Sequence, residues 1–131
     1  KKEYRIPSEA VMKVLIIENE KLLADSIQSV LERKGFEVEC VYDGETGAEY
    51  AELGIYDLLI LDEILASCNY GMVRETSVVE FLQNRPEKLE VVLTGRNPSE
   101  TFLELADYVS EICMRRHPYE KGIPARRGIE F

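Results

Sequence analysis

The sequence predicts an open three-layer α/β/α sandwich built on a mainly parallel sheet of five strands. Two observations lead to this fold class. Short apolar runs alternate with segments of helical periodicity along most of the chain, and polar clusters, glycines and prolines separate them. The chain has 131 residues, 45% hydrophobic and 31% charged. A chain of this length and composition has room for one core, so we expect residues 1–131 to fold as a single domain.

The expected strands differ in how much of each strand is apolar. Residues 13–17 (KVLII) form a continuous apolar run, which is typical of a strand buried on both faces of a parallel sheet. Residues 36–42 instead alternate apolar residues with Glu37 and Glu39, which predicts a strand with one polar face at a sheet edge. The expected strands are residues 13–17, 36–42, 57–61, 89–94 and 108–114.

Two helices are expected between the first three strands. Apolar residues recur at helical spacing over residues 22–31, and Gly35 follows as a stop signal. Residues 45–53 form a second helical segment, which follows the turn Asp43-Gly44.

Two further helices are expected on either side of the fourth strand. Ser77 and Glu80 form the S-x-x-E pattern of a capping box, and they predict a third helix that Pro86 terminates. Asn97 as a cap residue, with Pro98 at the first helical position, predicts a fourth helix that runs to about residue 106.

Charge and composition exclude several classes of function. The net charge of −9 argues against binding to nucleic acid. Residues 1–63 carry a net charge of −8, residues 64–131 a net charge of −1, and the end of the chain, residues 115–131, is a basic tail of +3. This tail is either a solvated end or an anion-binding segment. No apolar run approaches the roughly 20 residues of a membrane helix, so we expect no membrane partner.

The cysteines predict a reducing compartment. Cys40, Cys68 and Cys113 are widely spaced and contain no CxxC pair, which argues against a disulfide framework and against a zinc site. The sequence opens with Lys1-Lys2 and then polar residues, unlike a secretory signal. We therefore expect free thiols and a cytoplasmic protein.

Four segments in the first half of the chain match one known pattern: MKVLIIENE at 12–20, KGFEV at 34–38, YDGE at 42–45 and YDLLILD at 56–62. On these segments, residues 12–62 resemble the first half of a response-regulator receiver domain. It implies the flavodoxin-like strand order 2-1-3-4-5, which we favour over the P-loop order. It also implies that Asp62 is the phosphate-accepting residue and that Mg²⁺ is held by Glu18, Asn19 and Asp62.

Other parts of a receiver site match less well. Thr94 stands where the family places a threonine or serine at the end of the fourth strand. The family has two acidic residues where this chain has Glu18-Asn19, so one ligand charge is lost. It also places a lysine at the end of the fifth strand, where this chain has Glu111 unless Arg115 or Arg116 takes that place. Magnesium binding is therefore expected to be weak.

The second half of the chain contains a different ordered series of segments, which are LDEI, YG, FLQNRPE, VVLTGR, ELAD, HPYEKGI and the closing RRGIEF. On these segments, residues 62–131 resemble the carboxyl-terminal half of an ATP:corrinoid adenosyltransferase. The family implies that Asp62-Glu63 is the acidic pair that ends the Walker B strand, near Mg²⁺ and ATP. Enzymes of this type hold the triphosphate in a GxxxxGK[ST] loop, and this pattern does not occur in the 131 residues. We therefore expect no enzymatic activity.

The change of resemblance at Asp62 predicts an engineered chimera of two half-domains, with an appended segment at residues 1–11. Tyr4-Arg5-Ile6 in that segment is either a short strand or a tag remnant. We expect no catalytic residues, with Asp62 and Thr94 as vestigial candidates, and no cofactor beyond weak Mg²⁺. We expect no native partner, although unmatched strand edges favour a homodimer or strand exchange.

Two alternatives to an inactive chimera remain open. One is a Mg²⁺-dependent phosphoacceptor module that uses Asp62, and the other is a protein related to the ATP:corrinoid adenosyltransferases. Three isolated residues also have a functional and a structural interpretation: His117 as general base or surface residue, Cys68 as reactive or inert thiol, and Arg96 as anion ligand or solvated side chain.

Overall fold

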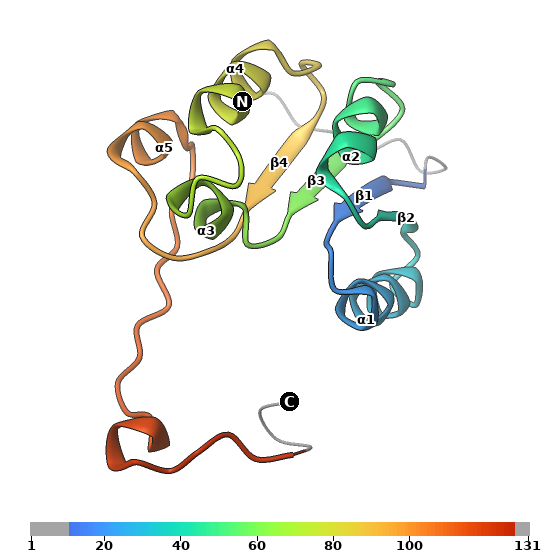
Figure 1. Cartoon of the computed structure of the whole chain (residues 1–131). Helices are drawn as coiled ribbons and strands as arrows, with labels where there is room; N and C mark the ends of the chain where they lie inside the picture. Colours follow the sequence, from blue (N-terminus) through green and yellow to red (C-terminus); the bar gives the residue numbers. More distant parts are fainter. Residues whose placement is uncertain (1–10, 128–131) are drawn as a thin grey trace, which may run out of the picture.

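The structure, a computed structural model, describes residues 11–127 and contains one parallel sheet flanked by helices (Figure 1). The appended segment therefore lies almost wholly outside the described residues, and so does the strand considered at Tyr4-Arg5-Ile6. The strands are β1 (Lys13–Ile17), β2 (Glu37–Val41), β3 (Leu58–Leu61) and β4 (Glu90–Leu93). The helices are α1 (Lys21–Glu32), α2 (Gly44–Ala51), α3 (Ile64–Asn69), α4 (Glu75–Asn84), α5 (Glu100–Leu105) and the 3₁₀ helix η1 (Pro118–Lys121).

The four strands lie in the order β2-β1-β3-β4, and all three pairings are parallel. This confirms the first four positions of the flavodoxin-like order, and it confirms that β2 lies at an edge. β1 is central, and its residues Val14, Leu15 and Ile16 are completely buried. A strand covered on both faces and paired on both sides is the environment that the KVLII run predicts.

The two faces of the sheet are covered unequally. α2, α3 and α4 lie on one face, and α1 lies on the other, mainly over β1 and β2 (Figure 1). On the α1 face, the Cys40 thiol donates a weak hydrogen bond to the carbonyl of Ala24 at 3.8 Å. Ile60 and Val92 pair in the register of β3 and β4 and share this face, but Ile60 is only half-buried and Val92 is exposed.

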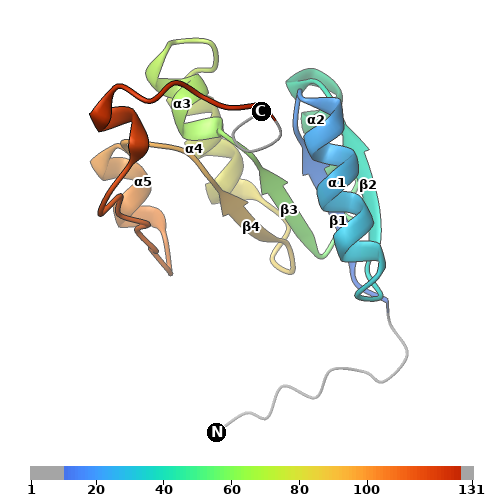
Figure 2. The same ribbon diagram turned by 90° about the horizontal axis from the view of Figure 1, so that it is seen from below.

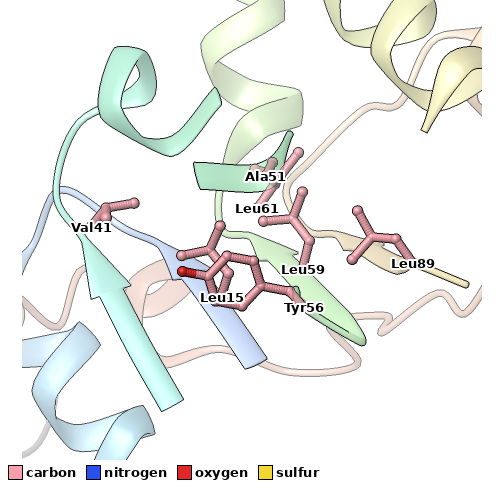
Figure 3. Close-up of a cluster of buried hydrophobic side chains, with 7 residues drawn as sticks. All are labelled: Leu15, Val41, Ala51, Tyr56, Leu59, Leu61 and Leu89. Carbon is pink, nitrogen blue, oxygen red and sulfur yellow. The ribbon is translucent and has the colours of Figure 1, made fainter. Parts of the chain in front are cut away.

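The main core lies on the α2 to α4 face, where side chains of alternate strand residues meet the helices. Figure 3 shows its buried members, which are Leu15, Val41, Ala51, Tyr56, Leu59, Leu61 and Leu89. A second, smaller cluster of Leu65, Val78 and Phe102 joins α3, α4 and α5. Leu93 at the end of β4 packs against both clusters, so the second half of the chain is joined to the first by shared apolar surface.

The predicted fifth strand is wrong. Residues 108–114 form no regular structure and are all exposed, and the chain runs away from the sheet after α5 (Figures 1 and 2). A parallel strand needs cover on both faces. The residues after Met114 contain Pro118, Gly122 and Pro124 and, as far as the structure describes them, form only the short η1, so no long helix there covers such a strand.

The sequence pattern predicted four of the helices, but it predicted the first residues of α4 and α5 incorrectly. α4 begins at Glu75 with Arg74 as its N-cap, so the Ser77 and Glu80 pair lies inside the helix and is no capping box. α5 begins one residue after Ser99, whose side chain accepts a hydrogen bond from the Phe102 N–H, so Ser99 and not Asn97 is the cap. The helix α3 was not predicted, because its six residues are too few to show periodicity.

No helix within residues 11–127 combines the length and the apolar character that crossing a bilayer requires. Cys40, Cys68 and Cys113 are all free thiols, as predicted.

Candidate functional site

Three polar residues meet where β1, β3 and β4 end. Glu18 follows β1, Asp62 follows β3 and Thr94 follows β4. Because the three strands are parallel neighbours, their carboxyl ends share one edge of the sheet. The Asp62 N–H donates to the Ile17 carbonyl at 3.4 Å and the Thr94 N–H donates to the Leu61 carbonyl at 3.1 Å, so the ladder fixes the positions of both residues.

The Thr94 hydroxyl links the two halves of the chain. It donates a hydrogen bond to Asp62 Oδ1 at 2.5 Å, and it accepts one from the Glu63 N–H at 2.8 Å. Glu63 is held in the left-handed region, with φ of 53°, a conformation that costs a non-glycine residue free energy. The hydrogen bond from its N–H to Thr94 helps to hold this turn, and the turn presents the Asp62 carboxylate to Thr94.

Glu18 is the buried charged residue of the site, with 5% of its surface exposed. Its Oε1 accepts a hydrogen bond from the Glu20 N–H at 2.6 Å. Burial raises the pKa of the Glu18 carboxyl, and the neighbouring Asp62 carboxyl raises it further. Two carboxyl groups that disfavour each other's charge create a position where a cation would be stabilised.

Gly95 lets the loop after β4 approach α3 closely. Its φ is 139°, and a Cβ atom at this position would lie 2.7 Å from Leu65 Cβ. The Leu65 N–H donates to the Thr94 carbonyl at 3.3 Å across the same contact. Nearby, the Asn69 side-chain amide donates to the carbonyls of Arg96 and Asn97, at 3.0 Å each. These contacts fix Thr94 relative to α3, and no pattern in the sequence indicated the role of Asn69.

The predicted magnesium ligands are brought together only in part. Glu18 and Asp62 are neighbours, whereas the Asn19 side chain is exposed. Within residues 11–127, no group of three or more histidine, cysteine or acidic side chains is arranged to hold a metal ion. The donor set that could hold Mg²⁺ is therefore two carboxylates, with the Asn19 amide oxygen as a third candidate ligand. Oxygen donors of this kind suit Mg²⁺.

The residues considered for the place of the receiver lysine lie away from this site. They are Glu111, Arg115 and Arg116, and all three are exposed in the segment that leaves the sheet (Figures 1 and 2). The candidate site thus brings together two carboxylates and a hydroxyl, and neither of these arginines compensates the negative charge.

The three isolated candidates have structural contacts of their own. His117 is exposed, and its Nδ1 accepts a hydrogen bond from the Tyr119 N–H at 3.1 Å, which caps η1. Burial raises the pKa of the Cys68 thiol, with a further contribution from Glu75, so Cys68 is not activated as a thiolate. The Arg96 side chain is exposed.

The second half of the chain matches a known enzyme family. Residues 45–131 match the family model of the ATP:corrinoid adenosyltransferases BtuR/CobO/CobP. A corrinoid adenosyltransferase of Sinorhizobium sp is 41% identical over 75 residues, which cover 56% of this chain and 35% of that protein. The corrinoid adenosyltransferase of Escherichia coli K12 is 36% identical over 75 residues, which cover 57% and 38%. The chain thus spans just over a third of the length of these curated relatives.

Response regulators are a second group of similar proteins. The transcriptional regulatory protein DltR of Streptococcus agalactiae is 44% identical over 54 residues, which cover 41% of this chain and 24% of that protein. An orphan response regulator of H. pylori superposes with a TM-score of 0.56 at 24% identity, over 73% of this chain and 78% of that chain. A CheY-like receiver domain of Methylobacillus flagellatus superposes with a TM-score of 0.53 at 22% identity, over 75% and 83%.

Together, these findings confirm both predicted resemblances and refine their boundary. The structural likeness shows a CheY-like flavodoxin fold. The family model begins at residue 45, inside α2 and before Asp62, so the sequence similarities do not simply exchange at the end of β3. Since the family model covers well over half of the chain, the chain belongs to the ATP:corrinoid adenosyltransferase family, and its sheet has the receiver-like strand order.

Proposed function

We propose that this chain is an engineered α/β chimera of a receiver half and an adenosyltransferase half, and that it has the complete reaction centre of neither. One observation carries the proposal. The chain has relatives of two unrelated kinds, DltR and the corrinoid adenosyltransferases, while a single sheet runs unbroken through β1, β3 and β4. A hybrid of this type needs only that the two parts bury shared apolar surface, and Leu61 and Leu93 provide such surface at the junction.

We infer that the chain lacks some of the groups needed for phosphoryl transfer and some of those needed for adenosyl transfer. Phosphoryl transfer needs positive charge around the transferring group, whereas the candidate site pairs Glu18 with Asp62, and Arg115 and Arg116 lie in the segment that leaves the sheet. Adenosyl transfer from ATP needs a cradle for the triphosphate. The sequence has no GxxxxGK[ST] pattern, and β1 is followed by Glu18-Asn19-Glu20, whose two carboxylates would repel a triphosphate. We therefore propose that the chain by itself is not an enzyme.

A ligand-binding experiment tests this proposal. The melting temperature of the purified chain is measured with Mg²⁺ and ATP, and separately with cobalamin, each at increasing concentration. A ligand at one hundred times its Kd stabilises a folded protein by about 2.7 kcal/mol. We expect no shift with either ligand, and a full-length corrinoid adenosyltransferase serves as the positive control. A saturable rise in melting temperature with ATP or cobalamin would contradict the proposal and favour an adenosyltransferase-related function.

A second candidate function is favoured by one contact in the candidate site. The hydrogen bond from Thr94 to Asp62 joins the residues that the receiver resemblance assigns to phosphate binding and phosphate acceptance. In this alternative an Asp62 oxygen attacks the phosphorus of a small acyl phosphate, the bond from phosphorus to the acyl oxygen breaks, and the carboxylate product leaves. Glu18 and Asp62 would hold Mg²⁺, which would neutralise part of the negative charge.

Intact mass spectrometry distinguishes the two candidates. The chain is incubated with Mg²⁺ and acetyl phosphate, beside Asp62→Asn as the matched control. An unchanged mass for both proteins supports the inactive chimera. A gain of one phosphoryl group that Asp62→Asn abolishes would instead establish the phosphoacceptor.

A further inference from the structure

β4 leaves one edge of the sheet open. It is the last strand in the order β2-β1-β3-β4, and within residues 11–127 no segment pairs with its outer side. Val92 on β4 is 44% exposed, on the face of the sheet where α1 covers mainly β1 and β2. An edge strand with exposed apolar residues offers backbone donors and acceptors to another strand.

The chain itself carries a segment suited to this edge. Tyr108 is 94% exposed and Ile112 is 98% exposed, and Val109 and Met114 are exposed as well. In the described part of the chain, the backbone groups of residues 108–114 make no hydrogen bond. Side chains alternate between the two faces of a strand, so Tyr108, Ile112 and Met114 would share one apolar face.

The geometry of α5 directs this segment away from its own β4. Ala106 ends the helix in an extended conformation, with φ of −76° and ψ of 132°. From there the chain runs away from the sheet, as Figure 1 shows. When an apolar segment leaves its own copy on an extended connection, it can pair with the sheet of a second copy. The contacts are then the same ones that it would make with the sheet of its own copy.

We propose that residues 108–114 of one copy add to the open edge of β4 in a second copy, which gives a two-fold exchanged dimer. The exchange uses each β4 edge and each segment 108–114 once, so the assembly closes at two copies. The charges of the chain agree with this arrangement. The basic tail, residues 115–131, follows the exchanged segment, and it would be carried to a second copy whose residues 1–63 hold a net charge of −8. The proposal does not depend on whether the chain has an activity.

The oligomeric state of matched variants tests the proposal. Mass is measured by light scattering after gel filtration over a range of protein concentrations, for the unaltered chain, for Ile112→Glu and for Leu53→Glu. Both substituted side chains are exposed, so neither substitution removes a core contact. We expect a dimer for the unaltered chain and for Leu53→Glu, and a monomer for Ile112→Glu. A monomer for the unaltered chain at all concentrations, or a dimer that persists in Ile112→Glu, would overturn the proposal.

A disulfide experiment then locates the contact. One copy carries Val92→Cys with Cys113→Ser, the other carries Ile112→Cys with Cys113→Ser, and the two are mixed and oxidised gently. Exchange predicts a covalent dimer that contains one copy of each kind. A single chain that carries Val92→Cys, Ile112→Cys and Cys113→Ser is the comparison. If it forms its disulfide only within itself and the mixture forms none, residues 108–114 close their own sheet and exchange is contradicted.

Discussion

The two halves of this chain differ most in how their apolar residues are covered. In the first half, β1 is paired on both sides and covered on both faces, and Leu15 has no exposed surface. In the second half, β4 is paired on one side only, and Ile112 in the following segment is 98% exposed. Residues 108–114 also carry apolar side chains, although Ser110 and Glu111 interrupt them. The contrast indicates that cover on both faces is needed before such a segment becomes a strand of a parallel sheet.

The largest expected effect is a difference in the free energy of unfolding between a substitution at a buried residue and one at an exposed residue. Leu15→Ala should lower the free energy of unfolding by about 2–5 kcal/mol, because it removes buried methyl groups and leaves a cavity in the main core. Ile112→Ala should change it by less than about 0.5 kcal/mol in the monomer. Urea unfolding at low protein concentration measures both. Similar losses for the two variants would mean that residues 108–114 are covered within one copy.

The next effect tests how tightly the second half docks onto its own helix α3. Gly95→Ala should destabilise the protein by about 1–3 kcal/mol, because a Cβ atom would meet Leu65 and because φ of 139° strains an alanine. Gly122→Ala is the control. Gly122 also has a positive φ, of 71°, but no atom lies within 4 Å of the position that its Cβ would take. Thermal unfolding should show the larger loss for Gly95→Ala, and the reverse order would contradict a tight contact at Leu65.

A smaller effect tests the hydrogen bond that joins the halves. Thr94→Val keeps the shape of the side chain but removes the donor to Asp62 and the acceptor for the Glu63 N–H. Each lost hydrogen bond costs about 0.5–1.5 kcal/mol. Thr94→Ser, which keeps the hydroxyl, should lose less stability than Thr94→Val in urea unfolding. Equal stability of the two variants would show that the hydroxyl contributes nothing to the junction.

The smallest effect depends on pH and lies in the first half alone. The pKa of Glu18 is raised above its ordinary value of 4.5, so the folded state holds a proton that the unfolded state releases more readily. Ionising Glu18 in the folded state lowers the free energy of unfolding. This loss of stability is absent below pH 4.5 and develops as the pH rises from that value towards the folded-state pKa. Glu18→Gln should therefore gain stability relative to the unaltered chain as the pH rises.

Unfolding of the unaltered chain and Glu18→Gln at a series of pH values measures this difference. Glu20→Gln serves as the control because Glu20 is exposed. A stability difference between Glu18→Gln and the unaltered chain that stays constant with pH would contradict the raised pKa.

Local sequence pattern was enough to predict several elements of the fold and part of the site. The KVLII run predicted β1, the alternation with Glu37 and Glu39 predicted the edge strand β2, and Gly35 predicted the end of α1. Asp62 and Thr94 were also predicted as candidate site residues through the receiver resemblance, and a hydrogen bond joins them in the structure.

Only the tertiary structure shows which apolar segments are buried by other parts of the chain. Residues 108–114 have the composition of a strand, yet the described residues after them contain no long helix to shield a fifth position in the sheet. The same holds at the site, where Asn69 and Gly95 matter because the loop after β4 approaches α3 closely. Burial and close approach are properties of segments far apart in the chain, and local periodicity carries no information about them.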